Sequence, residues 1–151
     1  MTLTSIEALA GLRSVLVVDD DPDTAALVCA IVRRLGQGVH AVDVRGGREA
    51  IDYLRRHSRH GRAARPDAIL LDLEMPEMSG LEVLEALARE ADLRNIPVAM
   101  FTGRDDEAMR RRALQGGACA YALKPVDPSL LTGVLGETLA ICLASRKEAR
   151  P

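Results

Sequence analysis

Five short apolar runs alternate with five segments of helical periodicity, and no other feature of this chain restricts its fold as strongly. Strict βα alternation predicts a parallel sheet with right-handed crossovers and helices on both faces. It does not give the order of the strands. The expected strands are residues 14–21, 39–44, 67–71, 96–101 and 118–123. The first expected helix runs from a cap at Asp23 or Thr24 to about Leu35, and the second begins after Gly47. The other three expected helices cover residues 81–91, 104–115 and 128–147.

Polar residues stand where the expected strands end. In a doubly wound parallel sheet, ligands bind outside the carboxyl ends of the strands. We therefore expect carboxylates, a hydroxyl and an ammonium group to gather at one rim of the sheet. The residues at these ends are Asp19, Asp20, Asp21, Asp72, Thr102, Gly103, Lys124 and Pro125.

These groups together fit phosphoryl transfer onto an aspartate. Clustered carboxylates repel one another unless a cation or proton intervenes, and hard oxygen ligands suit Mg²⁺. A carboxylate is also a competent nucleophile toward phosphorus, and Asp72 follows the most apolar run. Transfer requires neutralisation of the phosphoryl oxygens. We expect Mg²⁺ and Lys124 to supply this charge and the Thr102 hydroxyl to donate a hydrogen bond.

Composition argues against several other classes of protein. A chain of 151 residues with 48% hydrophobic and 28% charged residues is typical of one globular domain. A net charge of −2 argues against a nucleic-acid partner. No apolar run approaches the roughly 20 residues of a membrane span, so we expect no membrane partner. Cys29, Cys119 and Cys142 lack metal-like spacing, so we expect buried free thiols in a reducing cytoplasm.

Four motifs in order, VLVVDDDPD, LLDLEMPEMSGLEVL, FTG and AYALKP, resemble the CheY-like receiver domain of two-component response regulators. The likeness runs from about Ser14 to Ile141. It implies a flavodoxin-like, doubly wound (βα)5 fold whose five parallel strands have the order 2-1-3-4-5. We expect the domain to span residues 14–147, with a tail at 148–151. An extension at 1–13, which has room for a short helix, precedes it.

The resemblance also implies roles for residues at the rim. Asp72 matches the phosphoacceptor, and Lys124 matches the lysine that accompanies it. Asp19 and Asp20 match the acids that bind Mg²⁺, together with Asp72 and the backbone carbonyl of Glu74. Phosphorylation by a sensor histidine kinase or a histidine phosphotransfer protein follows from the same likeness.

A switch is implied as well, with Thr102 as its hydroxyl and Tyr121 as its aromatic residue. Movement of Thr102 toward a phosphoryl group would let the Tyr121 ring turn inward. The alternative is that Tyr121 merely fills the edge of the sheet.

Two stretches depart from the compact receivers. The basic segment from Arg55 to Asp67 is extended, as in a subset of single-domain receivers that partner bacterial phytochromes. It is either a solvated loop or a docking surface for an acidic partner.

Many family members carry a smaller residue in place of Glu74. We expect Glu74 to form an ion pair with Arg104 that shields an acyl phosphate from water.

The last helix has apolar residues on more than one face. A helix that covers a sheet needs one apolar stripe. We therefore expect a homodimer through the fourth helix, fifth strand and fifth helix, unless residues 4–12 fold back over this surface. With one helix after Lys124, we expect a stand-alone receiver that signals by protein contact. Two alternatives stay open: an interaction module that is never phosphorylated, and a Mg²⁺-dependent phosphohydrolase with an aspartyl nucleophile.

Overall fold

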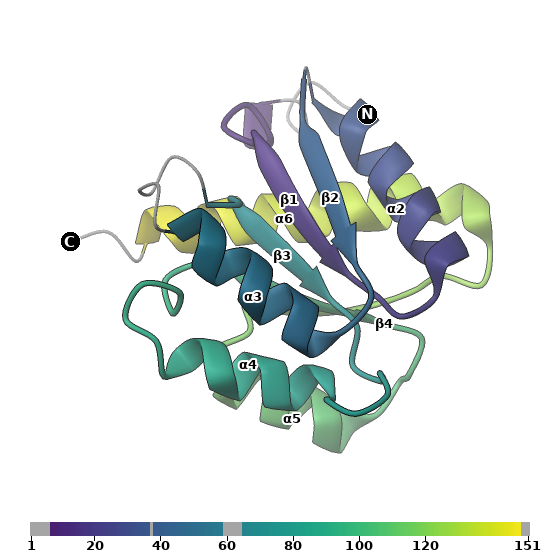
Figure 1. The fold of residues 1–151 in the computed structure, drawn as a ribbon. Coiled ribbons are helices and arrows are strands. Elements are labelled where there is room, and N and C mark those ends of the chain that lie inside the picture. The colour runs from purple at the N-terminus through teal and green to yellow at the C-terminus, as the bar shows by residue number, and fades with distance from the viewer. Residues whose placement is uncertain (1–6, 37, 59–64, 149–151) are drawn as a thin grey trace.

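The computed structural model describes residues 7–36, 38–58 and 65–148, which form five parallel strands with helices on both faces (Figure 1). The strand order is β2-β1-β3-β4-β5, which confirms the flavodoxin-like order that the family resemblance implied. The registers align β1, β3 and β4, so their carboxyl ends lie at one rim. The strands are β1 Ser14–Val18, β2 His40–Val44, β3 Ala68–Leu71, β4 Val98–Thr102 and β5 Ala120–Leu123.

The helices divide between the two faces of the sheet. Alternate strand residues point to opposite faces, so Leu16 and Ile69 belong to one hydrophobic cluster while Val15 and Leu70 belong to the other. The first cluster packs under α3, α4 and α5, and the second packs under α2 and α6 (Figure 1). The helices are α2 Pro22–Leu35, α3 Gly47–Ser58, α4 Gly80–Ala88, α5 Glu107–Gln115 and α6 Leu131–Glu148, with a 3₁₀ turn η2 at Pro128–Leu130.

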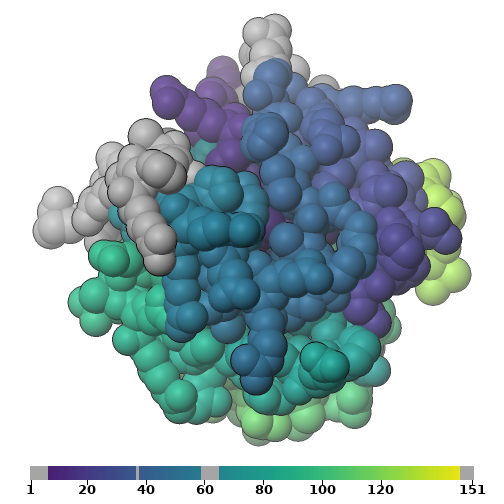
Figure 2. Space-filling model, in the orientation of Figure 1, coloured from purple at the N-terminus to yellow at the C-terminus, as the bar shows by residue number. Residues whose placement is uncertain are grey.

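Helix α3 contributes a narrow stripe of buried residues, Ala50, Ile51 and Leu54, to the first cluster. In the space-filling view, α3 and the neighbouring green surface of α4 close over this face of the sheet (Figure 2). The rim at the carboxyl ends of the strands is therefore the natural place for a site open to solvent.

Capping by aspartate side chains moves the start of α2 earlier and the start of α5 later than the sequence-based expectation. Asp21, rather than Asp23 or Thr24, caps α2, and its carboxylate accepts a hydrogen bond from the Asp23 amide at 3.3 Å. Strand β1 ends at Val18, three residues before the expected end. Helix α5 starts at Glu107 because Asp106 accepts from the Met109 amide.

The N-terminal extension lies partly outside the described residues. Within the described part, residues 7 and 8 are helical, and Leu9 and Leu12 are buried in the cluster under α2 and α6. The described part of the extension therefore packs into the core beside α6. It leaves Leu130 and Ile141 exposed, so it does not cover the outward-facing apolar surface, as the alternative to a dimer interface required. Residues 1–6 and the tail from 149 onward are outside the described residues.

The segment Pro128–Arg146 corrects the expectation that no apolar stretch reaches the length of a membrane span. It is 19 residues long and contains an 18-residue window with a mean hydropathy of 1.4, which is enough by length and composition to cross a membrane. In the fold, however, one face of α6 packs against the sheet, and the apolar side chains of this face account for much of the apolar composition of the helix. The buried residues of this stripe are Leu131, Leu135, Thr138, Leu139, Cys142 and Leu143.

Candidate functional site

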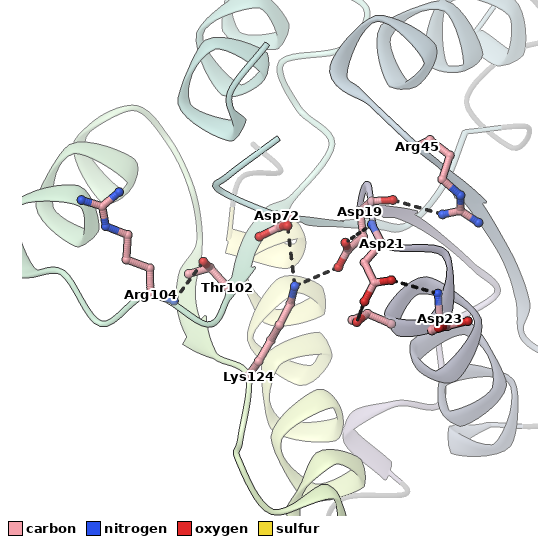
Figure 3. Close-up of polar contacts among 9 residues, drawn as sticks. Asp19, Asp21, Asp23, Arg45, Asp72, Thr102, Arg104 and Lys124 are labelled. Carbon is pink, nitrogen blue, oxygen red and sulfur yellow. Dashed lines mark hydrogen bonds and ion pairs between the residues drawn. The ribbon is translucent and has the colours of Figure 1, made fainter. Parts of the chain in front are cut away.

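The sheet holds three of the expected site residues by their backbones. The Asp19 amide donates to the Val44 carbonyl at 3.1 Å, and the Asp72 amide donates to the Val18 carbonyl at 2.9 Å. The Lys124 amide donates to the carbonyl of Thr102 at 2.7 Å. Each of these residues thus extends the hydrogen-bond ladder one step beyond its strand, which fixes the position of its side chain at the rim (Figure 3).

Three carboxylates converge at this rim. Asp19, Asp20 and Asp72 each offer an oxygen, and these oxygens lie within 4.8 Å of one another. Asp19 and Asp72 are 3% and 8% exposed, whereas Asp20 is open to solvent. Three hard oxygen donors at this separation fit a divalent cation such as Mg²⁺, which binds through a few carboxylates and keeps some of its water.

The electrostatics of Asp72 reflect this crowding. Burial, with a smaller contribution from the charges of Asp19 and Asp20, raises the pKa of Asp72 to about 6, although Lys124 acts in the opposite direction. A buried carboxylate near other acids is costly to ionise. A bound cation would relieve this cost, so the donor set and its electrostatics both suit a metal.

Lys124 reaches back across the rim from the end of β5. Its Nζ lies 2.8 Å from Oδ2 of Asp19 and 3.6 Å from Oδ2 of Asp72 (Figure 3). Figure 3 shows the ammonium group between the two acids. It therefore places a fixed positive charge where phosphoryl oxygens would lie against Asp72.

Thr102 and Tyr121 contact the backbone of the same residue, Arg104. The Thr102 hydroxyl oxygen, whose residue is 2% exposed, accepts from the Arg104 amide at 3.2 Å. The Tyr121 hydroxyl donates to the Arg104 carbonyl at 2.7 Å. The start of the loop after β4 therefore contacts both the Thr102 hydroxyl and the Tyr121 hydroxyl.

The expected ion pair between Glu74 and Arg104 is confirmed, with Nη1 of Arg104 3.2 Å from Oε1 of Glu74. Arg104 also pairs with Asp106 at 3.2 Å. Both Glu74 and Arg104 are exposed at the mouth of the site. They line a groove of about 620 Å³ between the β3–α4 loop and α5.

Two residues at the site escaped the sequence analysis. Nη1 of Arg45 donates to the backbone carbonyl of Asp19 at 3.1 Å (Figure 3). A Cβ atom on Gly80 would lie 2.3 Å from the backbone oxygen of Asp72, so only glycine permits this approach. The expected strand order places β2 beside β1 and was therefore a signal for Arg45, which follows β2, but no local signal indicated the contact at Gly80.

Comparisons with known proteins show the family of the chain. The family model for the response regulator receiver domain matches residues 15–135. The polar-differentiation response regulator DivK of Brucella anthropi is 36% identical over 115 residues, which cover 76% of this chain and 86% of DivK. The probable methanogenesis regulatory protein FilR2 of Methanothrix harundinacea is 37% identical over 113 residues, covering 75% of this chain and 72% of FilR2.

Solved structures give the same result. The phosphorylated cyanobacterial phytochrome response regulator RcpA is 27% identical with a TM-score of 0.77, and the match covers 89% of this chain and 96% of RcpA. The Mn²⁺-bound response regulator Rcp1 is 25% identical with a TM-score of 0.72, covering 83% of this chain and 90% of Rcp1. The family model and the relatives agree, and the chain belongs to the response regulator receiver domain family.

Proposed function

We propose that this receiver accepts a phosphoryl group on Asp72 from a sensor histidine kinase or a histidine phosphotransfer protein. One observation carries the proposal: Asp72 is a nearly buried carboxylate at the end of the central strand, beside Asp19, Asp20 and the ammonium group of Lys124. Receivers are signalling proteins rather than classical enzymes, so the phosphohydrolase alternative has little to support it.

In the proposed step, a carboxylate oxygen of Asp72 attacks the phosphorus of a phosphorylated histidine. The phosphorus–nitrogen bond breaks, and the imidazole keeps the electron pair and takes up a proton. Lys124 neutralises charge on the transferred group, and Thr102 donates a hydrogen bond to one of its oxygens. A Mg²⁺ ion would be held by Asp19, Asp20, Asp72 and the backbone carbonyl of Glu74, and it would further neutralise the phosphoryl oxygens.

The proposed response to phosphorylation runs through the loop after β4. Thr102 leaves the Arg104 amide to reach the phosphoryl group, which frees the loop that holds the Tyr121 hydroxyl. The Tyr121 ring then turns inward. The two hydrogen bonds to the Arg104 backbone support this coupling, because a shift at one of them displaces the other.

We propose that the receiver signals through contact with other proteins. The first such contact that we propose is a homodimer through α5, β5 and α6. Apolar side chains are exposed on β5, on α6 and in the segment between them, and surface of this kind favours association. The exposed residues are Leu123, Val126, Leu130 and Ile141.

A phytochrome-type kinase is the donor that we propose to test first. RcpA is named as a phytochrome response regulator, and RtBRR, 32% identical with a TM-score of 0.66, is named as a bacteriophytochrome response regulator. The extended segment between α3 and β3 supports the same choice, although residues 59–64 lie outside the described residues.

Incubation with acetyl phosphate, with and without Mg²⁺, followed by intact mass, separates the candidate functions. A receiver gains one phosphoryl group only with Mg²⁺, and Asp72→Asn abolishes the gain. An interaction module gains none under either condition. A phosphohydrolase instead turns over a range of phosphomonoesters without retaining the group.

A further inference from the structure

Two cysteines that are far apart in the sequence meet in the core. Cys119 directly precedes β5, and Cys142 lies on the buried stripe of α6. Their sulfur atoms are 3.1 Å apart, only about 1 Å more than the length of a disulfide bond. Both thiols are free in the structure. The two thiols are therefore close enough to be candidates for a disulfide that joins α6 to the residue before β5.

The two thiols differ in ways that suit an oxidation reaction. Cys119 is partly exposed, whereas Cys142 is fully buried. The hydrogen bond from the Cys142 thiol lowers the pKa of Cys119, and the same bond together with burial raises the pKa of Cys142. The accessible thiol is thus the one that ionises more readily, and thiolates are the species that peroxides oxidise.

We propose that Cys119 and Cys142 form a reversible disulfide when the protein meets a peroxide. The Cys119 thiolate attacks a peroxide oxygen, and the oxygen–oxygen bond breaks to give a sulfenic acid and a hydroxide or alkoxide ion. This ion takes up a proton and leaves as water or an alcohol. The sulfur of Cys142 then attacks the Cys119 sulfur, forming the disulfide and releasing water. A small thiol or dithiol restores both cysteines by exchange.

The disulfide does not lie at the phosphorylation rim. The Cys119 amide donates to the Val98 carbonyl at the start of β4, and β5 then runs through Tyr121 to Lys124 at the opposite end. Oxidation therefore clamps α6 to β5 without touching Asp72. The proposal does not depend on phosphorylation, and the oxidised protein retains the acceptor site.

The test is oxidation of the whole chain by a small excess of hydrogen peroxide. We expect the number of free thiols in the unfolded protein to fall from three to one, with loss of two hydrogen atoms at the pair. Peptide mapping without reductant then links Cys119 to Cys142, and dithiothreitol removes the link. Closing a loop of this length raises Tm by about 10 °C.

Variants separate this pair from general oxidation. Cys29, buried on α2, is the control, and Cys29→Ser keeps the disulfide. Cys142→Ser keeps a hydrogen-bond donor beside Cys119 and leaves a sulfenic acid there that a dione reagent traps. Cys119→Ala leaves Cys142 unreactive in the folded protein. Three retained thiols, a disulfide that includes Cys29, or a bond between two chains in the oxidised wild type would overturn the proposal.

Discussion

At the scale of single residues, the site depends on a carboxylate that the fold makes costly to ionise. Asp72 is 8% exposed, and burial raises its pKa to about 6 from an ordinary value of 3.8. The proton is therefore bound more tightly in the folded than in the unfolded state. Stability linked to Asp72 is present at low pH and is lost as the pH rises from about 4 through about 6.

This linkage gives a prediction for Asp72→Asn. In metal-free buffer, the variant has a free energy of unfolding close to that of the wild type at pH 4 and higher by about 3 kcal/mol at pH 7. Urea unfolding at several pH values measures the difference. A gap that does not change between pH 4 and pH 7 contradicts the account.

The Glu74–Arg104 pair leads to a second prediction. Removal of the Arg104 side chain opens the mouth of the site but keeps its backbone contacts to Thr102 and Tyr121, so the acyl phosphate in Arg104→Ala reacts with water faster. The pair is exposed, so the free energy of unfolding changes by less than about 1 kcal/mol. Intact mass against time measures the lifetime.

Arg89→Ala is the matched control, because Arg89 forms an exposed ion pair with Glu85 on α4. Its acyl phosphate should decay at the wild-type rate. If Arg104→Ala also decays at that rate, the pair does not shield the phosphate.

At the scale of elements, the start of α4 sets the position of the phosphoacceptor. Ser79 and Glu82 form a capping box, which fixes the first turn of the helix. The Gly80 amide donates to the Leu73 carbonyl at 2.8 Å, so the helix begins directly against the residues that follow β3. The close approach of Gly80 to Asp72 is part of the same junction.

Gly80→Ala should therefore lower the free energy of unfolding by about 2 kcal/mol, because the added Cβ meets the Asp72 backbone. Gly133→Ala on α6 is the control. Nothing lies within 4 Å of its added Cβ, and the exchange stabilises a helix by up to about 1 kcal/mol. Chemical denaturation of both variants tests the contrast, and equal effects would refute it.

The helices and strands also show how much of the fold could be predicted from the sequence. Alternation of apolar runs predicted all five strands, since burial on both faces leaves few polar positions within a strand. Strand order came only through the family resemblance, because pairing is a tertiary property. Helix caps were harder to predict, because both Asp21 and Asp23 are capable of capping a helix. Only the turn after β1 selects Asp21.

The main residues of the candidate site could also be predicted from the sequence. Asp19, Asp72 and Lys124 were identified because each directly follows an apolar strand, and parallel strands bring such positions together. The proximity of Cys119 and Cys142 was missed, because it depends on the rotation of α6 over the sheet, which a helix apolar on several faces does not reveal.

At the scale of the whole molecule, α6 both completes the core and presents apolar surface. Leu135 and Leu139 are fully buried, whereas Leu130 and Ile141 remain exposed. The described part of the N-terminal extension buries Leu9 and Leu12 beside α6 and leaves these two outward-facing side chains exposed. They supply apolar surface for the proposed dimer.

We therefore expect Ile141→Asp to dissociate the dimer into monomers, because a charge cannot be buried in an apolar contact without large cost. Leu27→Asp is the control, since Leu27 is equally exposed, at 48%, but lies on α2. Size-exclusion chromatography with light scattering measures the mass. A wild-type monomer at all concentrations, or equal behaviour of the two variants, would exclude this interface.

The central claim is that Asp72 carries the phosphoryl group, and mapping the modified residue tests it most directly. Protein treated with acetyl phosphate and Mg²⁺ is reduced with borohydride, which converts an aspartyl phosphate to homoserine. Mass spectrometry of the peptide containing residues 70–80 should then find homoserine at position 72 and at no other aspartate. Homoserine at Asp19 or Asp20, or unmodified Asp72 in protein that has gained a phosphoryl group, would contradict the account.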